Sequence, residues 1–214
     1  MSVEELKEIL HEKYPEVEVR EIQYEDIVFE ERVRLKCCHC KNYKEKWTCP
    51  GKMPELDYRK IISEYEHKAV VISKVAMHVG AGARSETETT AGERSERETT
   101  AGARSETETT AGERRETDGV MKKFREGVVL LHRAMLYMEG ELFKRNNAMA
   151  ESFIGCSCQL CEEGCAAEKC RHPEQARVPW DATGCNVVKT LEKIGIQVTF
   201  PATEYMYQYG LFVW

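Results

Sequence analysis

The chain has 214 residues, with 31 Lys and Arg against 37 Asp and Glu, a formal net charge of −6 and ten cysteines. This length suits one domain or two small lobes that share a core, and the acidic balance argues against a general nucleic-acid binder. No apolar run reaches the ~20 residues that span a bilayer, and residues 1–8 lack the basic and apolar regions of a signal peptide. We therefore expect a cytoplasmic protein without membrane insertion, whose cysteines do not form a disulfide framework.

Hydrophobic periodicity in the N-terminal half alternates between the helical and the strand period. Ser2 and Glu5 form a capping-box pattern at the start of the first helical stretch, and Pro54 suits the first turn of the second. The predicted elements are, in chain order, a helix over 2–13, a strand over 16–22, an extended stretch over 27–35, a helix from Pro54 to about Glu66, and a buried strand over 69–72.

Residues 81–120 consist of four decapeptides: AGARSETETT, AGERSERETT, AGARSETETT and AGERRETDGV. Alanine and Val120 are their only apolar residues, so this tandem repeat cannot stack around a core of its own, and it carries −4 of the net charge of −6. This composition predicts a mostly disordered surface insertion, with a phosphorylatable or partner-binding tether as the alternative. The insertion separates an N-terminal lobe, 1–80, from a C-terminal lobe, 121–214, and leaves both lobes nearly neutral in sum.

The C-terminal lobe begins with the most regular helical pattern, which predicts one long helix over 121–149 that packs against the core. Its apolar stripe consists of Phe124, Val128, Leu131, Met135, Met138 and Leu142, and His132 falls beside it as an interior or boundary histidine. The remaining predictions are a helix over 183–194, a strand over 196–200 and a terminal strand over 209–214. Interleaved strands and helices predict an α/β or α+β fold, with a small mixed sheet, flanking helices and cysteine-rich metal-binding loops.

Nine of the ten cysteines occupy two short windows that more than a hundred residues separate. Cysteines used as small hydrophobic residues would be scattered along buried faces instead. Gaps of two to four residues let one short loop present several thiolates to one point, which a metal centre requires. The first window contains Cys37, Cys38, Cys40 and Cys49; the second contains Cys156, Cys158, Cys161, Cys165 and Cys170; Cys185 stands apart.

The second window supplies four thiolates from one loop, in the order Cys158-x2-Cys161-x3-Cys165-x4-Cys170. This spacing is close to the bacterial ferredoxin run C-x2-C-x2-C-x3-C-P, with two gaps longer by one residue. Zinc sites more often pair two C-x2-C knuckles across a longer spacer. The spacing therefore favours a [4Fe–4S] cluster over structural zinc.

The first window, Cys37-x2-Cys40-x8-Cys49, supplies three regularly placed thiolates and no obvious fourth. Cys38, His39, or Cys156 from the other window could complete a site if the fold brings the windows together. A thioredoxin-like dithiol of Cys37 and Cys40 is disfavoured, because it needs a helix that starts at the motif. A second metal centre is the preferred interpretation, with iron and zinc both open.

The motifs together resemble a prokaryotic cysteine-rich family of unknown function, labelled only as predicted metal-binding proteins, over most of residues 20–75 and 121–214. The stretches that carry the resemblance are 32–37, 40–43, 47–50, 153–155, 157–161, 170–177, 182–184 and 186–190. The resemblance implies a metal or iron–sulfur protein with ligands at Cys37, Cys40, Cys49, Cys158, Cys161, Cys165 and Cys170. The chain departs from the family at 178–181, where the family usually reads Pro-Ser-Met-Glu, and at Cys156 and Cys185, where small or apolar residues are usual. The repeats have no counterpart.

Three functions fit these observations. The leading hypothesis is an iron–sulfur protein with one or two [4Fe–4S] clusters that passes electrons to a redox partner protein, because ligation is by thiolates alone and no P-loop, H-E-x-x-H or G-x-S-x-G motif is present. The alternatives are a structural zinc-binding interaction module, and a redox enzyme whose substrate binds an open cluster iron in the first window. We expect no nucleic-acid partner; oligomeric state and enzymatic activity stay open.

Overall fold

The computed structural model describes residues 1–77, 111–198 and 204–214, with side chains from residue 119 onward in the long helix. A four-stranded sheet lies at its centre, in the order β1-β2-β4-β3, and each of its three strand pairs is antiparallel. The strands are β1 (Val17–Glu21), β2 (Lys68–Ala76), β3 (Glu151–Phe153) and β4 (Tyr205–Val213). The antiparallel pairing and the flanking helices make the fold α+β, one of the two predicted classes. The central pair, β2 with β4, joins strands from either side of the repeats.

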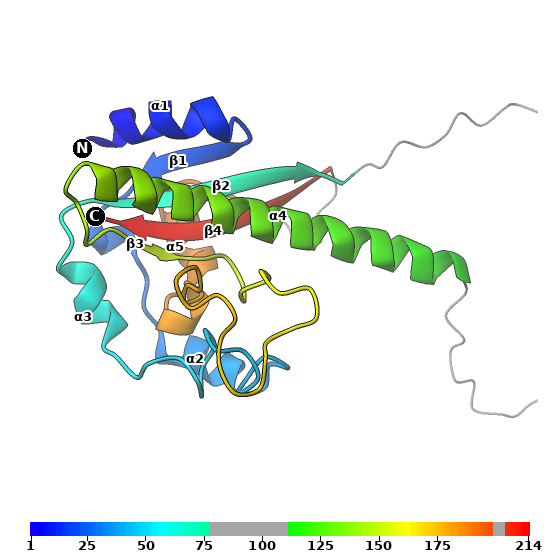
Figure 1. The fold of residues 1–214 in the computed structure, drawn as a ribbon. Helices are drawn as coiled ribbons and strands as arrows, with labels where there is room; N and C mark the ends of the chain where they lie inside the picture. The colour runs from blue at the N-terminus through cyan, green and yellow to red at the C-terminus, as the bar shows by residue number, and fades with distance from the viewer. Residues whose placement is uncertain (78–110, 199–203) are drawn as a thin grey trace, which may run out of the picture.

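Both faces of the sheet are covered, which explains the unbroken apolar run of β2 from Ala69 to Ile72. Ala69 and Val71 belong to a core built with α1 (Val3–Lys13) and α4 (Ala111–Lys144). Val70 and Ile72 point to the opposite face, into a second core that includes residues of α3 (Tyr58–Ser63) and α5 (Val187–Lys193). Figure 1 shows α1 and α4 along one side of the sheet and the loops around α2 (Glu31–Cys37) on the other.

The long helix α4 supplies most of the first core. Five members of the predicted stripe, from Val128 to Leu142, are buried, whereas Phe124 is only half-buried. The helix lies close to β4 at Gly210, where an added Cβ would come within 2.6 Å of the Met135 sulfur. His132 is fully buried, as the interior interpretation predicts, and its Nε2 lies 2.8 Å from the Gln175 carbonyl oxygen.

The prediction of an extended stretch over 27–35 is wrong in its second half, because α2 begins at Glu31. Val33 and Leu35 suggested alternation, but Leu35 is 61% exposed and no residue of α2 is buried. With no core contact to enforce a strand, the long Glu, Arg and Lys side chains favour a helix. This helix ends at Cys37 and so begins the first cysteine window.

Other helices and strands begin or end at residues that differ from the predicted ones, for local reasons. The Asp57 side chain accepts a hydrogen bond from the Lys60 backbone N–H, so α3 begins at Tyr58 rather than Pro54. Asn186 caps α5 in the same way, after a short 3-10 turn, η2 (Asp181–Thr183). The three-residue strand β3 was not predicted. Residues 196–198 are not a strand, and 199–200 lie outside the described residues.

The structure describes only one of the four repeats, so the predicted disorder can be compared with it only there. Residues 81–110 lie outside the described residues, whereas the fourth decapeptide, 111–120, is the beginning of α4 and not a disordered segment. This copy lacks the Thr-Thr ending of the others and precedes a strong amphipathic helix, and extending an existing helix is far easier than nucleating one. None of the helices in the described part of the chain is long and apolar enough to cross a membrane.

Candidate metal centre

The first window is a compact loop that follows α2. A backbone hydrogen bond from Cys40 N to the Cys37 oxygen, 3.0 Å, turns the chain immediately after the helix. The loop then closes on itself where Lys44 N donates to the Pro50 oxygen over 3.1 Å, with Lys44 and Gly51 both at positive φ. This closure returns the chain to the α2 end and buries the side chain of Cys49.

Three hydrogen bonds dock the first window on the second. Asn42 Nδ2 donates to Ser157 Oγ (3.1 Å), Lys46 Nζ donates to the Cys158 oxygen (2.5 Å), and Trp47 Nε1 donates to the Ala166 oxygen (2.9 Å). Each contact spans more than a hundred residues of sequence. The fold therefore brings the two cysteine windows together, which was the condition for a site that both of them share.

A cavity of about 620 Å³, which we call the cysteine cavity, opens where the windows meet. It is lined by Cys37, Cys40, Cys49 and Cys156, that is, by the three regularly spaced thiols of the first window and one from the second. Cys38 and His39, the other two candidates for a fourth ligand, do not line this cavity. The Cys38 thiol lies 3.8 Å from the Arg34 oxygen instead.

Cys156 takes its place in the cavity through an unusual backbone conformation. Its φ is 57°, in the left-handed region that non-glycine residues seldom adopt. The preceding Gly155 is held tightly, because an added Cβ would lie 2.5 Å from the Tyr209 oxygen. The strained turn therefore directs the chain from β3 into the cysteine loop, and strain of this kind occurs often at functional sites.

Cys37, Cys49 and Cys156 are hard to ionise without a cation. Burial raises the pKa of Cys37 to about 11, of Cys49 to about 12 and of Cys156 to about 11, and the Asp181 carboxylate raises each further. A metal ion would offset both effects and release protons as it binds. Metal binding by this set is therefore expected to strengthen with rising pH.

Asp181 is a site residue that sequence reasoning missed. It stands on the wall of the cavity, accepts a hydrogen bond from the Ala182 backbone N–H (3.1 Å), and has a pKa raised by burial. The only sequence signal was its place in the segment 178–181, where the chain departs from the family pattern. Nothing in its spacing pointed to thiols some 140 residues away.

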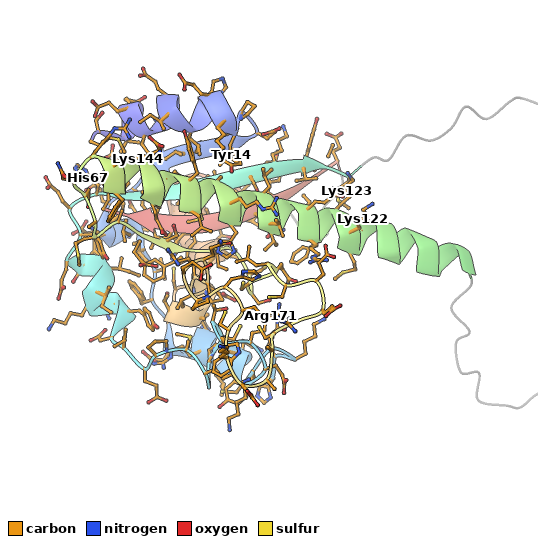
Figure 2. The ribbon with its side chains drawn as sticks, in the orientation of Figure 1. Tyr14, His67, Lys122, Lys123, Lys144 and Arg171 are labelled. Carbon is orange, nitrogen blue, oxygen red and sulfur yellow. The ribbon has the colours of Figure 1, made fainter. Side chains whose placement is uncertain are left out.

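Positive charge surrounds the thiols. Lys41, Lys122 and Arg125 line the cysteine cavity, the latter two from α4, and Figure 2 shows Lys122 on this helix above the loops. The Lys46 ammonium lowers the pKa of both Cys49 and Cys158, against the larger effect of burial. Cations in these positions favour thiolates and the net negative charge of a thiolate-bound metal group.

The second window is a loop without helix or strand. Its four predicted ligands, Cys158, Cys161, Cys165 and Cys170, are all half-buried. Burial raises the pKa of Cys158, and the nearby Cys165 and Cys161 raise it further. Arg171, labelled among the loops in Figure 2, crosses the window and donates to the Gly164 oxygen over 2.6 Å. The window is thus closed by an arginine that follows its last cysteine.

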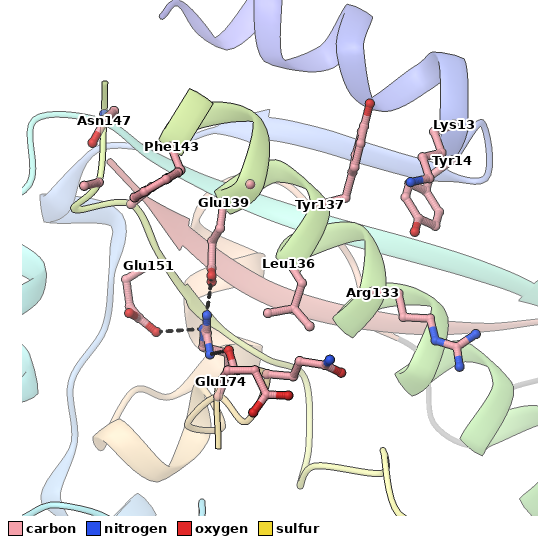
Figure 3. Close-up of a pocket in the computed structure, with 15 residues that line it drawn as sticks. Lys13, Tyr14, Arg133, Leu136, Tyr137, Glu139, Phe143, Asn147, Glu151 and Glu174 are labelled. Carbon is pink, nitrogen blue, oxygen red and sulfur yellow. Dashed lines mark hydrogen bonds and ion pairs between the residues drawn. The ribbon is translucent and has the colours of Figure 1, made fainter. Parts of the chain in front are cut away.

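The end of this loop is anchored to the sheet and to α4. Arg177 pairs with Glu139 of α4, with nitrogen–oxygen distances of 2.9 and 2.5 Å, and with Glu151 of β3 over 3.3 Å. Figure 3 shows Glu139 and Glu151 directed from these two elements toward the same ion pairs. The cysteine loop is therefore held at both ends, by Gly155 at its start and by Arg177 at its end.

The thiols of each window lie in one region of the structure but do not converge on a single point. All ten cysteines are free, and in residues 1–77, 111–198 and 204–214 no three His, Cys, Asp or Glu side chains lie close enough to hold one ion. The residues present fit a metal through their donor chemistry: four thiols on one cavity, and four more in an adjacent loop. Cys185 belongs to neither set; it is buried in the second core, 3.4 Å from Thr190 Oγ1.

An α+β fold whose two cysteine windows meet at a thiol-lined cavity defines a cysteine-rich protein with the donor set of a metal-binding protein. Residues 20–213 match the family described as "Predicted metal-binding protein (DUF2284)", and the chain belongs to this family. No curated protein and no solved structure matches the chain.

Proposed function

We propose that the chain is an iron–sulfur protein that works in electron transfer or within a redox complex. The observation that carries the proposal is the cysteine cavity, in which Cys37, Cys40, Cys49 and Cys156 provide four thiols from two distant windows. In this proposal Cys156 is the fourth ligand of the first centre. Cys158, Cys161, Cys165 and Cys170 hold the second centre, as their spacing predicts.

The surroundings support a cluster rather than a bare ion. A cluster ligated by four thiolates carries net negative charge, and Lys41, Lys46, Lys122 and Arg125 surround the two sets of thiols. When bound, a cluster of this type supplies one-electron chemistry at a potential that charge and solvent exposure tune. The protein's own contribution is to hold the thiols, partly exclude water and balance the charge.

Structural zinc is the second candidate, and a different observation favours it. The second window has no helix or strand of its own, and loops of this kind often depend on a zinc ion for their fold. In that case the protein is an interaction module, and the metal holds the two windows together.

Metal and sulfide analysis after anaerobic purification separates the two candidates. We expect iron and acid-labile sulfide in equal amounts, with a brown colour and broad absorbance near ~400 nm. A colourless protein that contains zinc and no sulfide would overturn the iron–sulfur proposal in favour of the zinc module.

Paired cysteine variants test the ligand assignment. We expect Cys156→Ser to remove the metal of the first centre and to keep that of the second. Cys38→Ser should keep both, because of these two residues only Cys156 lines the cavity. Metal content per chain and the electron paramagnetic resonance signal of the reduced protein provide the readout. If Cys156→Ser keeps a full complement, the first centre has an open position, as in the hypothesis of a substrate-binding redox enzyme.

A further inference from the structure

A second cavity adjoins the cysteine cavity. It has a volume of about 590 Å³, and we call it the aromatic cleft, after the rings of Phe124, Trp180, Tyr205, Tyr207 and Tyr209 that line it. Phe124, Cys156 and Asp181 line both cavities, so these residues form a common wall. The volume and the mostly apolar lining are those of a small-molecule site.

Aromatic faces from one edge of the sheet make up one side of the cleft. Tyr205, Tyr207 and Tyr209 alternate along β4 and therefore project from the same face. The Tyr207 and Tyr209 rings are stacked, with centroids 6.4 Å apart and an interplanar angle of 16°. Tyr205 and Tyr207 remain 39% and 44% exposed, which is a large aromatic surface to leave open to solvent.

These rings already attract a cation. The Lys74 ammonium lies 3.9 Å from the centroid of the Tyr205 ring and 5.9 Å from that of Tyr207. An ammonium above an aromatic face is stabilised by the negative face of the ring. The tyrosines of the cleft therefore have an electrostatic preference that is visible in the protein's own contacts.

The lining of the cleft carries negative charge, and the Lys74 ammonium lies beside it over the tyrosine rings. Among the described residues that line it, the only charged ones are Asp181 and Glu204, both carboxylates. Glu204 is held at the start of β4, where its backbone oxygen accepts a hydrogen bond from Met77 N over 2.9 Å. The cysteine cavity differs, since Lys41, Lys122 and Arg125 line it. A ligand cation competes with the Lys74 ammonium for the tyrosine rings, but two carboxylates in the lining against this one ammonium leave a negative balance, which with the aromatic faces selects for positive charge.

We propose that the aromatic cleft binds a small organic cation with an apolar body, such as an aryl or alkyl quaternary ammonium compound. The tyrosine rings contact the cationic head, Asp181 and Glu204 balance its charge, and the apolar body packs against Val188 and Val198, which line the cleft without being buried. A further consequence rests on the proposed function: the bound molecule lies against the wall that Cys156 shares with the first metal centre, so it is placed as a substrate or effector of that centre.

Matched probes test the charge preference. Calorimetry on the protein as purified would compare 3-(trimethylammonio)phenol with its neutral isostere 3-tert-butylphenol and with the anion 3-hydroxybenzenesulfonate. We expect the cation to bind about tenfold more tightly than the isostere, and the anion not to bind. Equal binding of cation and isostere, or no binding of the cation at about 10 mM, overturns the proposal.

Variants locate the binding. We expect Glu204→Gln and Tyr207→Leu each to weaken binding of the cation roughly three- to tenfold, and Glu204→Gln to leave the isostere unaffected. Glu192→Gln, on exposed α5 surface outside the lining, is the control and should change nothing. Cation binding that is insensitive to both cleft variants places the site elsewhere and refutes the assignment.

Metal analysis of the same preparation keeps the two proposals separate. If the protein binds the cation but contains zinc without sulfide, the cleft proposal stands and the iron–sulfur proposal is overturned. If the protein contains iron and sulfide but shows no charge preference, the iron–sulfur proposal stands and the cleft proposal is overturned.

Discussion

At the level of single residues, Lys46 connects the two cysteine windows. It comes from the first window, donates a hydrogen bond to the Cys158 oxygen in the second, and its charge favours the thiolates of both Cys49 and Cys158. Asp181 has the opposite effect, because its carboxylate disfavours the thiolates of the cysteine cavity. Two residues that are not cysteines, one in the first window and one on the cavity wall, thus act in opposite directions on the pKa of these thiols.

Replacing Lys46 tests this balance. Lys46→Met raises the pKa of Cys49 and Cys158, so protons compete better with the metal. We expect the pH of half-maximal metal retention against a chelator to rise by ~0.3–0.5 of a unit. Lys36→Met, on the exposed surface of α2, is the charge-matched control. Equal behaviour of the two variants would falsify a specific role for Lys46.

At the level of elements, two charged side chains fix the parts that carry the cysteines. Glu30, immediately before α2, accepts hydrogen bonds from Arg32 (2.8 Å), Lys189 (2.6 Å) and Asn186 (2.8 Å). It therefore ties the helix that ends at Cys37 to the start of α5. Arg177 does the same for the second window, through its ion pairs with α4 and β3. Short elements with little buried surface need such anchors to hold their position.

The Glu30 anchor predicts a pH-dependent stability. Hydrogen bonds from Arg32, then Lys189 and Asn186, lower the pKa of Glu30 to about 2 from 4.5. A lowered carboxyl pKa stabilises the fold above the unfolded value and loses this effect as the pH falls through the folded value. We therefore expect Glu30→Gln to lower the melting temperature at pH 7, by an amount that shrinks below about pH 4.5 and vanishes near pH 2.

The adjacent Glu31→Gln is the control for this measurement, because Glu31 is almost fully exposed and, among the described residues, its one ion pair, with Arg34, is 3.9 Å long. A deficit of Glu30→Gln that stays constant from pH 7 to pH 2 would show that packing, not the carboxylate charge, anchors α2.

The Arg177 anchor predicts a loss of stability. The side chains of Arg177 and Glu139 are 18% and 13% exposed, so Arg177→Met leaves the Glu139 carboxylate poorly hydrated and without this partner, whereas the Glu151 side chain, 42% exposed, remains hydrated. We expect a loss of about 2–3 kcal/mol in the free energy of unfolding, somewhat less than for a fully buried pair. Urea denaturation measures it, with Arg133→Met as control, since Arg133 is exposed in the same hollow and should stay within ~0.5 kcal/mol. Equal losses in both variants contradict the anchor.

At the level of the whole molecule, the sheet brings the two halves of the chain together. β2 and β4 pair over nine residues, from Lys68 with Val213 to Ala76 with Tyr205. This pairing, with α4 packed across it, places the first window beside the second although the repeats separate them in sequence. The two lobes therefore share one sheet, and the cysteine-rich loops lie together on one side of it (Figure 1).

The first three repeats, residues 81–110, should contribute nothing to this arrangement, because their composition cannot form a core. We expect deletion of residues 81–100, two whole decapeptides, to leave metal content unchanged and the melting temperature within ~2 °C, as the cost of loop closure varies slowly with length. Inductively coupled plasma analysis and a thermal scan are sufficient. A loss of metal would assign the repeats a role in the site that their sequence does not indicate.

Local pattern alone was enough to predict α1 with its capping box, the buried strand β2, the apolar stripe of α4 and the two cysteine windows, because each depends on residues a few positions apart. It failed for α2, where apolar and polar residues alternate in the sequence but none of the residues is buried. It also failed for β3, which is too short to show a period. Cys156 could be proposed from sequence only as one of three candidates for a fourth ligand.

Only the tertiary structure shows that Cys156, and not Cys38 or His39, lines one cavity with Cys37, Cys40 and Cys49, and that Asp181 lines it too. The pairing of β2 with β4 and the contact of Asn42 with Ser157 bring the two windows together there. The sequence by itself thus determined which side chains are available as ligands, since thiolate chemistry and spacing are local properties. The fold decided which of them share a cavity, and that they share a wall with an aromatic cleft, because such proximity depends on packing between segments more than a hundred residues apart.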